Sequence, residues 1–409
     1  MTDTLRLLTG DDAGGLLATA VETAGGRLVR WRAKQVDHRP GKGTTVAYTA
    51  RVAWPDREQE ETLAASAGIA TDHERPGVLL LSDGATDVAV WRYPNDPGLP
   101  ALTAACDPAA VHGLLVELGL AAPATGPDDV RLTTRAYRPR RRAVIQATFP
   151  RRGSGPGSVF LKVARPDRIE DLHRRHRLLV EAGVPVPAPL GWTDDGLLVL
   201  TALPGVPLRG ALRSQGPDAV SGEDLRAVLD ALPEALLDLP RRASWTDGAE
   251  HYARVIGAAL PDQADRATEL AEAIRSGLSG ADEPEVPVHG DFYEAQLFAA
   301  DGRLTGVLDV DSAGPGHRAD DLACLLAHVE VLAQIHDRDA ERLRAAVRAW
   351  LPAMDADPRT DPFALRLRTA GVLLSLATGP HRVQQAGWPE ATARRLDLVE
   401  EWLDAAARR

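Results

Sequence analysis

Cysteine is scarce in this sequence, since Cys106 and Cys324 are the only two among 409 residues. Two cysteines are too few for a disulfide framework or for a Cys-based zinc site. No apolar run approaches the roughly 20 residues that a membrane-spanning helix needs. The first twenty residues are acidic and interrupted by glycine, without the basic segment of a secretory signal. We therefore expect a soluble, cytoplasmic protein.

Lysine and asparagine are also rare. Lys34, Lys42 and Lys162 are the only lysines among 47 basic residues, and Asn95 is the only asparagine. Because arginine is the default cation of this chain, a lysine indicates a site that requires a compact ammonium group.

The net charge of −11 disfavours a general binder of nucleic acid or of anionic membranes. The basic run YRPRRR, residues 137–142, is a local exception. A solvated arginine cluster is the plain interpretation, and phosphate binding becomes credible if the fold brings this run beside a phosphate site.

Two stretches have the period-two pattern of antiparallel hairpins, residues 27–54 and residues 130–165. They also resemble each other, because HRPGKGTTVAYTARV and YRPRRRAVIQATFPR align with an offset of 99 residues. This weak repeat indicates a duplicated or capping hairpin domain ahead of the main body. A short helix is predicted around residues 108–119, and the chain beyond residue 220 is mainly helical.

Acidic residues follow two short predicted strands of the helical half. VPVHGD ends in Asp291, and GVLDVD ends in Asp309 and Asp311. Carboxylates at the ends of adjacent strands converge, as a divalent-metal and general-base site requires. Gln296 adds a neutral oxygen donor, and such oxygen ligands favour Mg²⁺ over Zn²⁺.

These motifs resemble the aminoglycoside phosphotransferase family of the protein-kinase-like fold. HGDFYEAQ, residues 289–296, matches the catalytic loop of that family. GVLDVDSAGPGHRADDLA, residues 306–323, matches its metal-binding loop and the helix that follows. The resemblance covers roughly residues 130–400, and the paired motifs are specific.

The resemblance implies an α+β, protein-kinase-like bilobal fold. It would consist of an N-terminal α+β cap domain at 1–90, an antiparallel β-rich nucleotide-binding N-lobe at 91–204 and a helical C-lobe at 205–409. The catalytic loop, the metal loop and the acceptor site are expected in the C-lobe.

The resemblance also implies residue roles, with ATP and Mg²⁺ as cofactors. Asp291 would accept the proton of the acceptor hydroxyl, and His289 would support the loop backbone. Asp309 would hold Mg²⁺, with Gln296 as a further ligand, and Asp311 would assist or only order the loop. Asp321 is expected to cap its helix and to brace the catalytic loop.

Gln296 stands where many family members have asparagine. The maltokinase and glucosamine kinase branch also has glutamine five residues after the aspartate, and it carries an N-terminal cap. Tyr293 and Ala295 depart from that branch, which has histidine and glycine at these positions.

Lys162, in the apolar strand SVFLKVA, is the expected contact of the nucleotide α- and β-phosphates. Glu170 and Asp171 on the next helix are both candidates for its acidic partner. The hinge is expected at LLVLTALPG, with backbone groups of Thr201, Ala202 and Leu203 meeting adenine. The phosphate-covering turn would be YRPRRR, whereas RRGSGPGS, residues 151–158, is interpreted as a flexible second hairpin turn.

The sequence thus predicts a small-molecule kinase that acts on a hydroxyl of a sugar, amino sugar or aminocyclitol. Alternatives are an antibiotic-modifying O-phosphotransferase and a catalytically inactive nucleotide-binding regulator. A protein kinase is disfavoured because no APE signature follows Asp309. For a cationic acceptor, the candidate carboxylates are Glu294, Asp320 and Glu330, and the alternative interpretation of these acids is a solvated surface.

Overall fold

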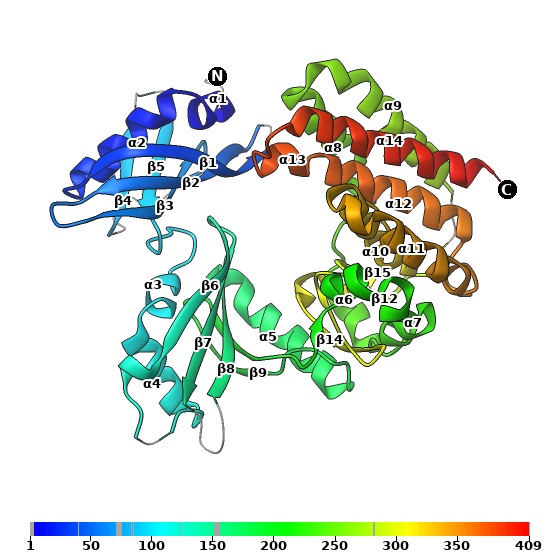
Figure 1. Cartoon of the computed structure of the whole chain (residues 1–409), viewed down its shortest axis with the longest axis horizontal. Coiled ribbons are helices and arrows are strands. Elements are labelled where there is room, and N and C mark those ends of the chain that lie inside the picture. Colours follow the sequence, from blue (N-terminus) through cyan, green and yellow to red (C-terminus); the bar gives the residue numbers. More distant parts are fainter. Residues whose placement is uncertain are drawn as a thin grey trace. The chain divides into compact units, whose positions relative to one another are not determined.

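The computed structural model describes residues 4–39, 41–70, 76–82, 84, 86–122, 124–150, 156–280 and 283–408. The chain divides into two compact units (Figure 1). Unit 1 comprises Met1–His173, Pro189–Ala202 and Arg382–Gln385, and unit 2 comprises Arg174–Ala188, Leu203–His381 and Ala386–Arg409. The predicted domain boundaries at residues 90 and 204 stay a prediction.

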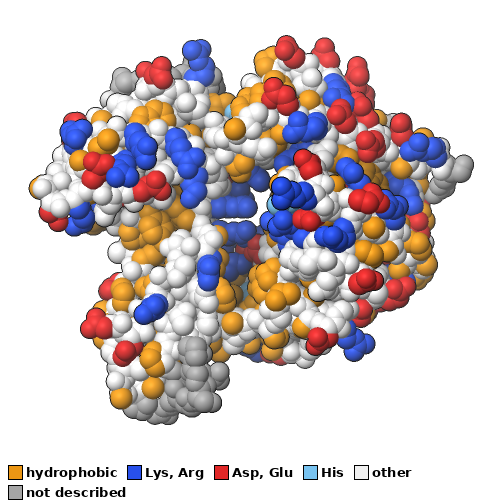
Figure 2. Space-filling model, in the orientation of Figure 1, with side chains coloured by type: hydrophobic (Ala, Val, Ile, Leu, Met, Phe, Trp, Pro, Cys, Tyr) orange, Lys and Arg blue, Asp and Glu red, His pale blue; other side chains and the backbone are white. Residues whose placement is uncertain are grey.

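Unit 1 begins with an antiparallel five-stranded sheet in the order β1-β2-β3-β5-β4. Its elements are α1 (Thr4–Thr9), α2 (Asp12–Thr23), β1 (Arg27–Arg39), β2 (Gly43–Ala53), β3 (Glu58–Ala67), β4 (Val78–Ser82) and β5 (Asp87–Arg92). Alternate residues of the strands pack with the two helices in one core, where the Tyr48 hydroxyl donates to the Leu8 carbonyl at 2.7 Å. Figure 2 shows Lys and Arg side chains over this sheet. Charged side chains on the edge strand β1 hinder pairing with a second sheet.

The second sheet of unit 1 has the order β6-β7-β8-β10-β9 and is also antiparallel. Its elements are α3 (Leu102–Ala105), α4 (Pro108–Glu117), β6 (Arg131–Arg138), β7 (Arg142–Pro150), β8 (Pro156–Ala164), α5 (Pro166–Glu181), β9 (Pro189–Thr193) and β10 (Leu197–Thr201). One face packs against α3 and α4, and the other packs against Ile169 and Leu172 of α5. Both predicted hairpin regions and the helix expected at 108–119 are confirmed.

The two sheets are copies in their topology. In each, the strand order in space is first, second, third, fifth, fourth. β1 ends at Arg39 and β2 begins at Gly43, while β6 ends at Arg138 and β7 begins at Arg142, which is the offset of 99 residues seen in the sequence. The predicted duplication is therefore confirmed, although the described residues between β3 and β4 of the first copy form no helix equivalent to α5. Pro40 and residues 151–155, with most of the predicted glycine-rich turn, lie outside the described residues.

Unit 2 is mainly helical, as predicted, so the predicted α+β fold class is confirmed. Its helices are α6 (Leu208–Gln215), α7 (Gly222–Asp230), α8 (Ala249–Ala259), α9 (Ala264–Leu278), α10 (Arg318–Ile335), α11 (Ala340–Asp355), α12 (Pro362–Ala377), α13 (Gly379–Arg382, whose last residue falls in unit 1) and α14 (Trp388–Ala407). Helix α10 is buried nearly all round, because it lies at the centre of the unit 2 core. Ser221 caps α7 by accepting from the Asp224 amide.

Two small sheets complete unit 2, in the orders β11-β13-β14 and β12-β15. The strands are β11 (Val206–Pro207), β12 (Val286–Val288), β13 (Leu297–Ala300), β14 (Arg303–Val307) and β15 (Gly314–Gly316). The predicted adjacency of VPVH and LTGV is wrong, because β12 pairs with β15 and β14 pairs with β13. Among the described residues, no helix combines the length and apolarity that crossing a bilayer requires.

Candidate active site

His289 joins the two loops that carry the predicted catalytic and metal-binding acids. Its imidazole is buried, and Nε2 lies 2.8 Å from the Leu308 carbonyl oxygen. Nδ1 lies 3.3 Å from the Asp291 amide nitrogen and accepts from it. These partners require the tautomer with a proton on Nε2. His289 thereby ties the residue preceding Asp309 to the backbone of Asp291.

Gly290 occupies a position that only glycine fits. Its φ is +78°, and a Cβ there would lie 2.7 Å from the Ser312 carbonyl oxygen. Any larger residue would meet both left-handed strain and a backbone clash. Glycine lets the loop turn tightly between β12 and Asp291.

Asp321 braces the same loop from helix α10. Its carboxylate accepts from the His289 amide at 2.6 Å and from the Gly290 amide at 2.7 Å. Complete burial raises the pKa of Asp321 to about 7, against the lowering by these hydrogen bonds and by Arg318. The predicted brace is confirmed. The predicted helix cap is wrong, because α10 begins one turn earlier and its N-cap is His317.

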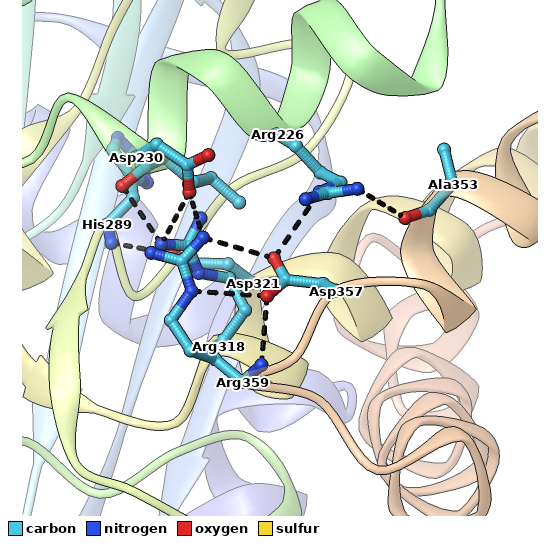
Figure 3. Close-up of polar contacts among 9 residues, drawn as sticks. Arg226, Asp230, His289, Arg318, Asp321, Ala353, Asp357 and Arg359 are labelled. Carbon is cyan, nitrogen blue, oxygen red and sulfur yellow. Dashed lines mark hydrogen bonds and ion pairs between the residues drawn. The ribbon is translucent and has the colours of Figure 1, made fainter.

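A partly buried network of arginines and carboxylates lies behind Asp321 (Figure 3). Arg318 is only 2% exposed, and its Nη2 pairs with Asp230 at 3.1 Å and donates to the Leu229 carbonyl at 3.2 Å. The buried Asp357 pairs with Arg359 at 3.1 Å and with Arg226 at 3.5 Å. Desolvation lowers the pKa of Arg318. The network places positive charge behind the loop, and the sequence motifs gave no sign of it.

Asp309 and Gln296 lie in contact. Gln296 Nε2 donates to Asp309 Oδ2 at 3.2 Å and to the Tyr293 hydroxyl at 3.1 Å. The Leu308 amide donates to the Gln296 carbonyl at 2.7 Å. Asp309 itself has a left-handed backbone, with φ of +58°, which turns the chain sharply after β14. The structure therefore brings Gln296 and Asp309 together, and Asp311 follows in the 3₁₀ helix Val310–Ser312.

The described part of the chain holds no group of three or more His, Cys, Asp or Glu side chains able to bind a metal ion. The predicted magnesium ligands include two such residues, Asp309 and Asp311, together with the amide of Gln296. All three supply hard oxygen donors, which is the donor type that Mg²⁺ prefers, so these residues fit the ion.

Two residues of helix α10 near the catalytic loop were not singled out for the site by the sequence. Cys324 Sγ lies 3.9 Å from Asp291 Oδ1, and burial raises the pKa of this thiol well above its usual value. His328, one turn further along α10, stacks on the Tyr293 ring with centroids 4.1 Å apart. The i, i+4 spacing of Cys324 and His328 on a helix was the available signal.

The three acids considered for a cationic acceptor are all paired with arginines. Glu294 pairs with Arg209 at 2.8 Å, Asp320 with Arg368 at 2.8 Å, and Glu330 with Arg344 at 3.8 Å. These carboxyl groups are largely buried and form ion pairs with arginines of unit 2. This differs from the prediction that they face solvent or a cationic acceptor.

Lys162 lies in unit 1, on the central strand β8 between β7 and β10. It is 5% exposed, and its side chain shares the sheet face of Phe160 and Ala164, which α5 covers. On α5, Asp171 is half-buried and Glu170 is exposed. Thr201 ends β10, and Ala202 and Leu203 follow at the border of the two units. The hinge function of these three residues stays a prediction.

Comparison with protein families gives a match over residues 136–363, which is more than half of the chain, to the phosphotransferase enzyme family, APH. The chain belongs to this family. The match includes Lys162 and both acidic motifs, and it supports the predicted enzyme class, a small-molecule phosphotransferase. A comparison with curated protein sequences finds no match.

Several solved structures resemble the chain. A thermostable mutant of aminoglycoside phosphotransferase APH(4)-Ia is 15% identical with a TM-score of 0.48, covering 72% of this chain and 99% of that chain. A choline/ethanolamine kinase family protein from Mesorhizobium loti is 16% identical with a TM-score of 0.47, covering 72% and 94%. Macrolide 2'-phosphotransferase MphH from Brachybacterium faecium is 20% identical with a TM-score of 0.42, covering 71% and 97%.

Proposed function

We propose that this phosphotransferase moves the γ-phosphoryl group of ATP, with Mg²⁺ as cofactor, to a hydroxyl group of a sugar, an amino sugar or an aminocyclitol. The observation that carries the proposal is the linkage of the two acidic loops. His289 bridges the Asp291 backbone to Leu308, and Gln296 contacts Asp309. Phosphoryl transfer depends on such positioning of a base and of negative charge near a metal, with little covalent chemistry.

Asp291 is the proposed general base. Its carboxylate would accept the proton of the acceptor hydroxyl while the acceptor oxygen bonds to the γ-phosphorus and the bond to the ADP oxygen breaks. The brace from Asp321 and the contact with His289 fix the backbone on both sides of this residue. A fixed backbone limits the conformations in which the carboxylate fails to meet the hydroxyl.

Asp309, Gln296 and Asp311 are the proposed magnesium ligands. Bound Mg²⁺ would neutralise charge on the nucleotide phosphates. Gln296 would present its side-chain carbonyl oxygen to the ion. The side-chain amide would have to rotate for this, because its nitrogen faces Asp309 in this structure.

Lys162 is the proposed contact of the α- and β-phosphates, with Asp171 as its acidic partner. Asp171 is favoured over Glu170 because Lys162 is buried on the face that α5 covers and Glu170 is exposed. Thr201, Ala202 and Leu203 are proposed to meet the adenine through backbone groups.

The proposal is tested by ADP release from Mg-ATP across a panel of sugars, amino sugars and aminoglycosides, with Asp291→Asn as the control. We expect at least one acceptor to stimulate ADP release by the wild-type protein only, while the variant still binds ATP. Stimulation by aminoglycosides alone would favour the antibiotic-modifying alternative. ATP binding without turnover on any acceptor would favour the regulatory alternative.

A further inference from the structure

The turn between β6 and β7, residues 139–141, departs from its counterpart in the first sheet. At the corresponding place the first sheet has Gly41, with φ of +74°, and the second has Arg140, with φ of +59°. A side chain in this left-handed conformation costs about 1 kcal/mol or more. Because the corresponding turn of the first sheet has glycine here, the strain at Arg140 indicates that contacts of its side chain compensate for this cost.

Arg140 is bound by the first sheet and by the segment that connects the two sheets. Its amide donates to Asp96 Oδ2 at 2.7 Å. Its guanidinium donates to the Ala70 carbonyl at 2.8 Å and lies 3.4 Å from Ser66 Oγ. We call these four residues the Arg140 latch.

Ser66 occupies the place in the first sheet that Lys162 occupies in the second. Lys162 pairs with Val144 on one side, and Ser66 pairs with Thr45, which lies 99 residues before Val144. The guanidinium of Arg140 thus meets the face of the first sheet that is equivalent to the nucleotide face of the second. The β6–β7 turn of the second sheet thus contacts this face of the first sheet.

Further contacts fix the same turn. Asp96 is buried and accepts from the Gly98 amide at 2.7 Å and from the Tyr137 hydroxyl at 2.8 Å. A Cβ at Gly98 would lie 2.9 Å from the Arg140 Cα, so the connecting segment approaches the turn as only glycine allows. Arg141, the next turn residue, pairs with Asp37 of β1 at 3.4 Å.

We propose that the N-terminal sheet is a positioning device, which through the Arg140 latch holds the β6–β7 turn in the position in which it covers the nucleotide phosphates. This inference rests on the proposed function, in which that turn covers the phosphates. The side chains of Arg140 and Arg141 are directed to the first sheet, and their backbone amides donate to Asp96 and to the Arg138 carbonyl, so the turn contributes a fixed shape rather than free charge.

Arg140→Gly tests the inference, because glycine is native to the sister turn and relieves the strain, while the guanidinium contacts of the latch with Ala70 and Ser66 are removed. Loss of the latch lowers the fraction of molecules with a binding-competent turn, so we expect the KM and the Kd for Mg-ATP to rise about tenfold. We expect the kcat at saturating ATP and the KM for the acceptor to stay within about twofold of the wild-type values. Once ATP is bound, the turn has its competent conformation in the variant as well. Asp96→Asn keeps a hydrogen-bond acceptor but removes the charge, so we expect it to raise the Kd for Mg-ATP by less than Arg140→Gly does.

Arg51→Ala is the matched control, since Arg51 lies in the same first sheet and forms an exposed ion pair with Glu58. We expect it to leave ATP affinity unchanged. Unchanged or tighter ATP binding in Arg140→Gly would overturn the inference, as would an equal loss in Arg51→Ala. Failure of the wild-type protein to bind Mg-ATP would instead contradict the proposed function.

Discussion

Replacement of Asp321 by asparagine removes the charge that braces the catalytic loop. Burial raises the pKa of Asp321 from 3.8 to about 7, so between these values the folded protein binds more protons than the unfolded chain. The free energy of unfolding therefore falls as pH rises through this window. Between about pH 6 and about pH 8, the contribution of Asp321 to the free energy of unfolding of the wild-type protein falls by about 1.4 kcal/mol. Asp321→Asn lacks this group and shows no such fall.

The same substitution weakens the brace itself. Asparagine has one carbonyl oxygen to offer, so one of the His289 and Gly290 amides loses its acceptor. A buried amide without a partner costs about 1–3 kcal/mol, and a comparable loss of transition-state stabilisation lowers kcat about 10- to 100-fold. The destabilisation of Asp321→Asn relative to wild type is thus larger at pH 6 than at pH 8.

Urea unfolding followed by tryptophan fluorescence at several pH values measures the first effect, and steady-state kinetics measures the second. Asp337→Asn is the control, because Asp337 is exposed just beyond the same helix. Parallel stability profiles of wild type and Asp321→Asn over this pH range would refute the assigned burial effect. Full turnover by the variant would refute the role of the brace.

Three further substitutions test the other assigned roles. Asp309→Ala removes magnesium-stimulated turnover without a change of melting temperature, and undiminished ADP release in a magnesium titration would contradict the metal role. Asp171→Asn is expected to raise the KM for ATP about tenfold, because it removes the proposed acidic partner of Lys162. Glu170→Gln is expected to leave that KM unchanged. If ATP titrations instead showed a higher KM for Glu170→Gln and an unchanged KM for Asp171→Asn, Glu170 would be the acidic partner.

Short motifs predicted which loops form the candidate site. Asp291, Asp309 and Asp321 stand at fixed positions in HGDFYEAQ and LDVDSAGPGHRADDLA, and the structure brings their loops together. The rarity of lysine singled out Lys162, and the structure buries it on the central strand of its sheet. The repeat in sequence predicted a duplicated or capping hairpin domain, and the two sheets share their strand order.

Pairings between distant segments were not predictable. β12 and β15 are three residues each, and GPG has none of the β-branched or aromatic residues that mark a strand. The network of Arg318 and the Arg140 latch join residues far apart in sequence, where local patterns carry no signal. The same reason explains why Glu294 and Asp320 were expected to meet solvent or a ligand and instead meet arginines.

We infer that the chain transfers the γ-phosphoryl group of Mg-ATP to the hydroxyl of a small molecule. Phosphorus NMR of the reaction with one stimulating acceptor tests it most directly, because it follows the group that is transferred. We predict that the γ-phosphate signal of ATP decays as a phosphate-monoester signal of the acceptor appears, with Asp291→Asn giving neither change. Decay of ATP to ADP and inorganic phosphate, with no monoester formed from any acceptor, would contradict the account.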